Sequence, residues 1–214
     1  MKSNVNKQFI SLKGKPVLAH TLEKFERSPL INDIIVVVRD KEIELCRSAV
    51  LDKHAFKKIK ALVAGGDERV HSVAKGLAQC SEDTDLVVVH DGARPLLTLS
   101  LLQRVLEKAL ECGAAIAAVH VKDCIKEVGD EGHVRQTLER SCLWAAQTPQ
   151  AFRYSVLKEA YDKALPDVVY DDAMLVELCQ GDVRVVEGDY RNIKVTTPAD
   201  LKIAAVMMEE SACE

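Results

Sequence analysis

The chain has 214 residues, of which 48% are hydrophobic, so it is long enough to fold as one domain around a sizeable core. Its formal net charge is −4 and it contains no basic block, which argues against nucleic acid as the main partner because phosphate backbones require clustered Lys and Arg. No apolar run approaches the ~20 residues of a membrane span, and the N-terminus lacks the apolar stretch of a signal peptide.

Strands and helices are predicted to alternate along most of the chain. Short apolar runs rich in β-branched residues predict the strands, and the stretches between them predict the helices. In chain order, the predicted elements are a helix at 16–26, a strand at 34–38, a helix at 41–51, a strand at 60–64, a helix at 70–80, a strand at 86–90, a helix at 99–112, a strand at 114–121, helices at 155–165 and 171–180, strands at 183–186 and 192–195, and a last helix that opens at 197–200.

The predicted strands are apolar on both faces. Runs such as Ile34 to Val38 do not alternate polar with apolar residues, which is typical of strands in parallel sheets covered by helices. We therefore predict an α/β fold with a mostly parallel sheet flanked by helices, in a single domain of residues 1–214. One segment, 121–144, contains Gly129-Asp130-Glu131-Gly132 between two runs of mixed polarity, and it predicts a β-hairpin arm that projects from the sheet or lies at its edge.

The loop after the strand at 86–90 is the first candidate site, because ligands of open α/β sheets bind beyond the carboxyl ends of the strands. Asp91 stands at that strand end, where a carboxylate can hold a metal ion or a sugar hydroxyl, and Gly92 allows close backbone approach. Arg94 offers a planar fork suited to phosphate. The alternative is a helix-capping Asp followed by a surface Arg, and a buried-type strand leading into the loop favours the functional interpretation.

Other strand ends carry weaker signals. Gly65 and Gly66 lead into a helix and expose backbone N–H groups suited to a nucleotide, although an ordinary turn is the alternative. Lys194 can anchor a phosphate, whereas a snorkelling surface lysine is the alternative. The segment 144–150, with the only Trp of the chain, reads alone as a packed loop, and Asp171-Asp172 reads as a helix cap.

Together these stretches resemble the 2-C-methyl-D-erythritol 4-phosphate cytidylyltransferase family of the non-mevalonate isoprenoid pathway. The resemblance spans almost the whole chain in family order. It rests on segments 6–9, 14–18, 64–69 with Ser72, 89–95, 121–123, 143–152 and 192–198. It implies a Rossmann-like sheet of the nucleotide-diphospho-sugar transferase type and a homodimer built through the arm. It also implies transfer of CMP from CTP to methylerythritol phosphate with Mg²⁺, releasing pyrophosphate.

The resemblance also implies roles for individual residues. Gly66, Asp67 and Ser72 would hold the cytidine, and Lys7 would stabilise charge on the α-phosphate. Lys194, together with Arg140 from the arm of the partner, would clamp the substrate phosphate. The remaining implied site residues are Asp91, which would contact the sugar alcohol or a metal ion, and Gly92, Arg94 and Thr148, which would line the same pocket.

The chain departs from the family pattern at its start. Members of the family begin with a strand and a glycine-rich loop that wraps the triphosphate, and Met1 lines up with the Met that closes this loop. We expect a sheet without that central strand and weak CTP affinity in this form, and a native start upstream of Met1. At a second position, Cys124 stands where the family usually has a Thr that contacts substrate.

Two other functions have the same sequence features. Ribitol-5-phosphate cytidylyltransferases share almost the same motifs and differ in the alcohol, so the nucleotide-side residues do not discriminate. A non-catalytic dimeric relative is the second alternative, which the absent loop favours and the retained charged residues oppose. The seven cysteines are widely scattered without a C-x-x-C pair, which is typical of free thiols in a reducing cytoplasm.

Overall fold

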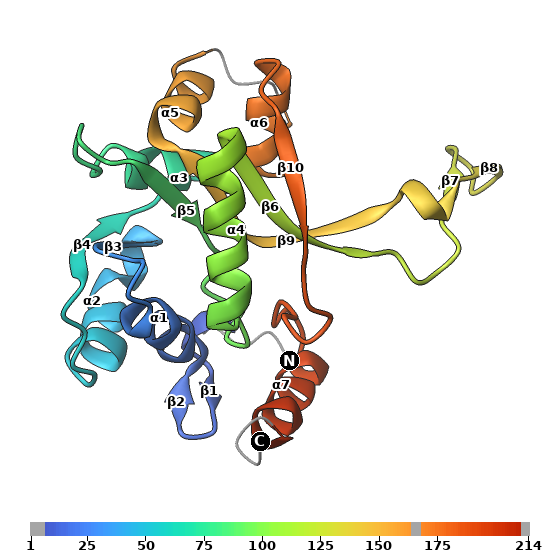
Figure 1. The fold of residues 1–214 in the computed structure, drawn as a ribbon. Helices are drawn as coiled ribbons and strands as arrows, with labels where there is room; N and C mark the ends of the chain where they lie inside the picture. The colour runs from blue at the N-terminus through green and yellow to red at the C-terminus, as the bar shows by residue number, and fades with distance from the viewer. Residues whose placement is uncertain (1–6, 164–167, 211–214) are drawn as a thin grey trace.

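The computed structural model describes residues 7–163 and 168–210, which form an α/β fold with a long projecting arm (Figure 1). The strands are β1 Ser11–Leu12, β2 Lys15–Pro16, β3 Ile34–Val38, β4 Ile59–Ala64, β5 Leu86–Val89, β6 Ala114–His120, β7 Lys126–Val128, β8 Val134–Thr137, β9 Trp144–Arg153 and β10 Val183–Glu187. The helices are α1 Val17–Arg27, α2 Ile43–Cys46, α3 Arg69–Leu77, α4 Leu99–Cys112, α5 Tyr154–Asp162, α6 Asp172–Leu178 and α7 Pro198–Glu210.

The main sheet has four strands in the order β10-β6-β9-β5. Strand β10 pairs with β6 in parallel, whereas β9 runs antiparallel to both of its neighbours, so β5, β6 and β10 share one direction. A second sheet consists of β3 and β4, again in parallel. The predicted α/β class and the mostly parallel sheet are therefore confirmed.

Strands β3 and β5 are not joined by hydrogen bonds within the described part of the chain, so the strands there form two separate sheets. Side chains bridge the separation instead. Phe25 of α1 belongs to a buried cluster against which Ile34 of β3 and Leu86 and Val88 of β5 pack. Side-chain packing around Phe25 of α1 therefore holds together two sheets whose strands are not joined by hydrogen bonds.

Helix α4 covers one face of the main sheet and is visible in front of β6 in Figure 1. Its buried side chains pack onto alanines of β6 and β9, which are small enough for the helix to approach closely. Thr98 caps the helix by accepting a hydrogen bond from the N–H of Leu101 at 3.2 Å. Gly113 ends it at a φ of +95°, which a residue with a Cβ rarely adopts.

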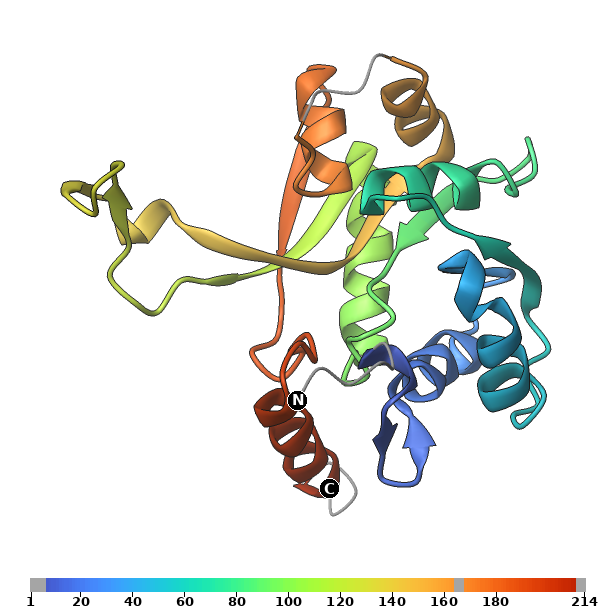
Figure 2. The ribbon, with the colours of Figure 1, turned by 180° about the vertical axis from the view of Figure 1, so that it is seen from behind.

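The opposite face is covered by α3, α5 and α6 (Figure 2). A second buried cluster lies there, built around Phe152 of β9, which is fully buried. The last helix, α7, begins with a reciprocal capping box, as predicted. The Asp200 carboxylate accepts from the N–H of Thr197 at 2.7 Å, and the Thr197 hydroxyl accepts from the N–H of Asp200 at 3.2 Å.

The arm is formed where β6 and β9 leave the sheet together and continue to the β7–β8 hairpin (Figures 1 and 2). The predicted hairpin within 121–144 is thus confirmed. At the root of the arm the His120 and Trp144 rings lie 3.6 Å apart between centroids. Nearby, the Lys122 ammonium stands 3.6 Å over the Tyr190 ring.

Several predicted elements were wrong or displaced. The predicted strand at 192–195 is a segment outside any sheet. Asn192 is buried there, and its side-chain amide donates hydrogen bonds to the Gln147 side chain and the Thr148 carbonyl of β9. The segment 144–150 belongs to β9 and is not a packed loop. Pro16 ends β2 and precedes α1, and the predicted helix at 41–51 is a short α-helix between a 3₁₀ turn and a π-helical turn. The end of the predicted helix at 155–165 lies outside the described residues. No helix within residues 7–163 and 168–210 is both long and apolar enough to cross a membrane.

Candidate functional site

The loop after β5 is fixed in place by its main chain. The N–H of Asp91 donates to the Thr148 hydroxyl of β9 at 3.0 Å, and the carbonyl of Gly92 accepts from the Thr21 hydroxyl at 2.9 Å. A Cβ on Gly92 would stand 3.0 Å from the Leu18 side chain, so a larger residue here would require the Leu18 side chain of α1 to shift. Asp91 is thus held at the strand end from two sides.

Three cations converge on the Asp91 carboxylate. Lys194 Nζ lies 3.0 Å and Arg94 Nε 3.3 Å from Oδ2, and Arg69 Nε lies 3.9 Å from Oδ1. Burial alone would raise the pKa of Asp91, but Lys194, Arg94 and Arg69 outweigh it and hold that pKa below its ordinary value. Asp91 is therefore ionised at neutral pH. Its cations come from three separate stretches of the chain, which makes the cluster a candidate anion site.

Arg94 is buried rather than exposed, which excludes the surface-Arg alternative. Its Nη1 donates to the carbonyl of Asn192 at 2.7 Å, so two edges of the guanidinium contact protein groups. Burial lowers the pKa of Arg94, while Asp91 raises it in part. The predicted phosphate fork is turned inward, and in this structure Arg94 holds Asp91 and the 192–195 segment.

Lys194 extends from the segment that was predicted as a strand. That segment is anchored by the Asn192 amide, which donates to the Thr148 carbonyl at 2.8 Å, and by the N–H of Val195, which donates to the Ala93 carbonyl at 2.8 Å. The Lys194 side chain is 46% exposed, yet its ammonium is paired with Asp91. Lys194 is therefore poised at the edge of the cluster, accessible to an anion from solvent.

The glycine loop between β4 and α3 packs tightly on that helix. A Cβ on Gly65 would come within 2.6 Å of the Ser72 hydroxyl oxygen, and one on Gly66 would collide with the His71 side chain. The Ser72 hydroxyl accepts from the N–H of Gly66 at 3.1 Å and donates to the Glu68 carbonyl at 3.1 Å. Both glycines are required by this close approach, and Ser72 fixes the shape of the loop.

The remaining predicted residues lie at the margins. Asp67 is exposed in the glycine loop, and Lys7 is exposed in a 3₁₀ turn. The next residue, Gln8, has its side-chain oxygen 4.0 Å from the place where a Cβ on Gly92 would stand, so this turn lies beside the Asp91 loop. Arg140 lies on the arm, where its Nη1 donates to the Lys122 carbonyl at 2.8 Å. Within one chain, Arg140 is not part of the Asp91 cluster.

Two residues of the cluster were missed as site residues. Arg69, the first residue of α3, lies between Asp91 and the carboxylate of Asp172, with Nη2 2.6 Å from Asp172 Oδ2. The Asp171-Asp172 pair was predicted as a cap, and Asp171 does cap α6 by accepting from the N–H of Met174 at 3.0 Å. Asp172 is fully buried and makes the ion pair instead. The sequence offered one signal for this role of Asp172: a helix needs one N-cap, which Asp171 supplies, so the second carboxylate is left for another partner.

His90 makes stability at acidic pH a testable property of the site. Its Nε2 donates to the Arg94 carbonyl at 3.2 Å, while Nδ1 is buried without a hydrogen-bond partner, so protonation would place an N–H donor at a buried atom with no acceptor. Burial lowers the pKa of His90 from 6.5 to about 4. The unfolded chain therefore binds a proton between those values while the folded chain does not, and stability falls as pH drops through this window.

We expect the urea concentration at the midpoint of unfolding to decrease as the pH is lowered from 6.5 to 4. In His90→Phe this decrease should be smaller. The exposed His133→Phe is the matched control and should leave the slope unchanged. An identical slope in the His90 variant would contradict this account.

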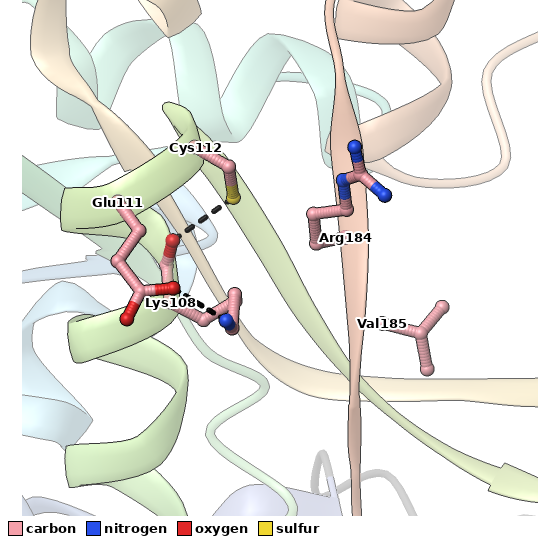
Figure 3. A pocket seen from close by; sticks show the side chains of 5 residues that line it. All are labelled: Lys108, Glu111, Cys112, Arg184 and Val185. Atoms are coloured by element: carbon pink, nitrogen blue, oxygen red, sulfur yellow. Dashed lines mark hydrogen bonds and ion pairs between the residues drawn. The ribbon is translucent and has the colours of Figure 1, made fainter.

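A surface hollow of about 410 Å³ lies elsewhere, between α4 and β10 (Figure 3). Its charged groups are already paired: Lys108 with Glu111 inside the hollow, and Arg184 with Asp182, which lies outside its lining, at 2.8 Å. The Cys112 thiol donates to the Lys108 carbonyl at 2.9 Å. The hollow offers no free charge to a ligand, so the Asp91 cluster remains the candidate site.

The sequence is similar to a family of known enzymes along almost its whole length. It matches the family described as 2-C-methyl-D-erythritol 4-phosphate cytidylyltransferase over residues 1–210. A relative of that name from Syntrophotalea carbinolica is 47% identical over 212 residues, covering 98% of this chain and 91% of the relative. Another from Geobacter metallireducens is 46% identical over 216 residues, covering 98% and 92%.

Solved structures agree with the sequence comparison. The crystal structure of 4-diphosphocytidyl-2C-methyl-D-erythritol synthase from Anaerococcus prevotii matches with a TM-score of 0.86 at 31% identity, covering 97% of this chain and 92% of that chain. A 2-C-methyl-D-erythritol 4-phosphate cytidylyltransferase structure from Thermus thermophilus matches with a TM-score of 0.76 at 32% identity, covering 94% and 92%. These structures have the same fold as this chain.

Proposed function

The chain belongs to the 2-C-methyl-D-erythritol 4-phosphate cytidylyltransferase family, and from this membership we propose that it transfers CMP from CTP to 2-C-methyl-D-erythritol 4-phosphate. The products are 4-diphosphocytidyl-2-C-methyl-D-erythritol and pyrophosphate, and the reaction serves isoprenoid precursor synthesis. The observation that carries the proposal is the cluster of Lys194, Arg94 and Arg69 around Asp91, at a strand end beside a glycine loop. This arrangement suits two phosphorylated substrates.

The chemistry requires no side-chain nucleophile. A phosphate oxygen of the alcohol substrate attacks the α-phosphorus of CTP, a new P–O bond forms, and the bond from that phosphorus to the bridging oxygen of pyrophosphate breaks. Because two anions must meet, catalysis consists mainly of positioning and charge neutralisation. The positive charge for both comes from Lys194 at the exposed edge of the Asp91 cluster, from Lys7, and from Arg140 of a second copy.

Each predicted residue has a place in this scheme. Gly66, Asp67 and Ser72 hold the cytidine through the loop that the Ser72 hydroxyl fixes. Lys194 lies at the solvent edge of the cluster and receives the phosphate of the alcohol. Lys7 neutralises the α-phosphate from the turn beside the Asp91 loop. Gly92, Arg94 and Thr148 position Asp91, and Gly92 and Thr148 also line the pocket.

Mg²⁺ fits this site as the metal of the reaction. The described residues contain no group of three or more His, Cys, Asp or Glu side chains arranged to hold a metal. Mg²⁺ is usually held by one or two carboxylates together with substrate phosphates, and Asp91 provides such a carboxylate beside the anion site. When bound, the ion neutralises charge on the phosphate oxygens.

The arm supports a homodimer that completes the site. The arm projects from the sheet (Figure 1), and in its own chain Arg140 donates to the Lys122 carbonyl of the arm at 2.8 Å. Its role in this scheme is to clamp the substrate phosphate in the site of a second copy. A cytoplasmic location is supported by the cysteines, because all six in the described residues are free thiols.

Pyrophosphate release measured with CTP and either of two polyol phosphates tests the function. We expect kcat/KM for methylerythritol 4-phosphate to exceed that for ribitol 5-phosphate by about a hundredfold, because an alcohol with differently placed hydroxyls leaves polar groups of a site unpaired. The assay should cover a wide range of CTP concentrations. A higher rate with ribitol 5-phosphate would identify the sister activity, and no release with either alcohol would favour a non-catalytic dimer.

A further inference from the structure

Asp91 uses its two oxygens unequally. Oδ2 is engaged by both Lys194 at 3.0 Å and Arg94 at 3.3 Å. Oδ1 has only Arg69 nearby, with Nε at 3.9 Å, which is beyond hydrogen-bond distance. Among the described residues, Oδ1 therefore accepts no hydrogen bond from a side chain. An ionised, largely buried carboxylate oxygen without a close donor is suited to contact an incoming substrate.

Arg69 is kept from Oδ1 by a second carboxylate. Its Nη2 lies 2.6 Å from Asp172 Oδ2, and the Asp172 side chain is fully buried. The other oxygen of Asp172 accepts from the Tyr161 hydroxyl of α5 at 2.6 Å. Asp172 is thus fixed in direction by Tyr161 and by its position at the start of α6, and the guanidinium of Arg69 is drawn toward it.

We propose that Asp172 is a positioning residue that holds Arg69 away from Asp91 and so keeps Asp91 Oδ1 open to the substrate. The Arg69 guanidinium has two carboxylates within reach: Asp172 Oδ2 lies 2.6 Å from Nη2, and Asp91 Oδ1 lies 3.9 Å from Nε. The nearer carboxylate is buried and has no other cation within the described contacts, so it competes strongly for the guanidinium. This inference rests on the proposed function, because it assigns Oδ1 to the substrate of that reaction.

The test removes the charge of Asp172 while keeping its shape. In Asp172→Asn, Arg69 should turn to Asp91 and occupy Oδ1, and kcat/KM for methylerythritol 4-phosphate should fall about tenfold because a charge-assisted hydrogen bond to substrate is lost. Arg69 is one third exposed, so its freed charge can be hydrated and the variant should fold. Asp182→Asn breaks an exposed Asp–Arg pair with Arg184 and serves as the matched control, with unchanged rates.

A double variant separates positioning from a merely structural tie between α3 and α6. Arg69→Met with Asp172→Leu removes the tie and also removes the guanidinium that would block Oδ1, and a packed apolar pair in place of a buried ion pair is commonly tolerated. We expect its kcat/KM to be at least threefold above that of Asp172→Asn. If the double variant is as slow as Asp172→Asn, or if folded Asp172→Asn has wild-type rates, the proposal is wrong.

A crystal structure of Asp172→Asn gives a readout that does not depend on activity. The Arg69 guanidinium should lie within hydrogen-bond distance of Asp91, and an unmoved Arg69 would contradict the inference. If Asp172→Asn does not fold, Tyr161→Phe serves as the second variant, since it removes the hydroxyl that directs Asp172; the same movement of Arg69, in part, is expected. An inactive wild-type protein would overturn the proposed function, whereas the position of Arg69 in these variants would still decide the inference.

Discussion

Asp91→Asn is expected to lower kcat/KM for CMP transfer by about a hundredfold to a thousandfold, which is the effect of removing one preorganised electrostatic group from a catalytic site. The carboxylate organises Lys194 and Arg94 through Oδ2, and its ionised state is maintained by the cations around it. The asparagine has the same shape but no charge, so it orients Lys194 less strongly. Pyrophosphate release under saturating CTP measures the loss.

The control for this variant is again Asp182→Asn, an isosteric loss of one carboxylate from an exposed pair. Asp91→Asn leaves three cations around an uncharged amide. Circular dichroism must therefore show that the variant is folded at the assay temperature. A folded Asp91→Asn protein with more than a tenth of wild-type activity would show that the Asp91 cluster is not the reaction centre.

Mixing two inactive variants should restore activity if the arm supplies Arg140 across the dimer. Arg140→Ala removes the arm residue and Lys194→Ala removes the phosphate anchor of the same chain. In a heterodimer of the two, one site receives both wild-type residues and the other receives neither. Random exchange of subunits at equal amounts should therefore give about a quarter of wild-type activity, from a mixture in which each parent alone has almost none.

The comparison that matters is a mixture in which both lesions belong to one chain. A protein with Arg140→Ala and Lys194→Ala in the same chain, mixed with an equal amount of wild type, should also give about a quarter of wild-type activity, all of it from wild-type homodimers, because each site of the heterodimer then lacks one residue. If Arg140 acted within its own chain, this mixture would give about a half. Sedimentation must show a dimer throughout. If the mixed single variants stay inactive although heterodimers form, Arg140 does not act across the interface.

The parallel strands were predictable because an uninterrupted β-branched run such as Ile34–Val38 has few alternatives to a strand buried on both faces. Strand β9 was not, because its buried positions include Gln147, Thr148 and Gln150, which give neither an apolar run nor an alternating pattern. The opposite error occurred at 192–195, where an apolar-looking segment is held by the Asn192 side chain and not by a strand ladder.

The position of the Asp91 loop was predictable from the sequence, whereas the side-chain pairs around Asp91 depend on tertiary contacts. Asp91 follows a recognisable strand, but Arg94 and Lys194 were predicted to meet phosphate, and the structure pairs both with Asp91. The pairing of Arg69 with Asp172 joins the starts of two helices that are distant in sequence, and no spacing rule connects them. Whether a charged side chain points toward solvent or toward a buried partner is decided by packing, and sequence patterns do not carry that information.

Strand β9 connects the arm directly to the Asp91 loop. It runs from Trp144 at the root of the arm, through Thr148, which holds the main chain of Asp91, to the buried Phe152, and its pairing with β6 shifts register between Ala146 and Gln150. Deleting one residue between Trp144 and Thr148 would turn one of these two side chains to the opposite face of the strand. A change in the length of the arm is therefore expected to disturb the Asp91 loop least in the turn between β7 and β8, which contains no residue of β9.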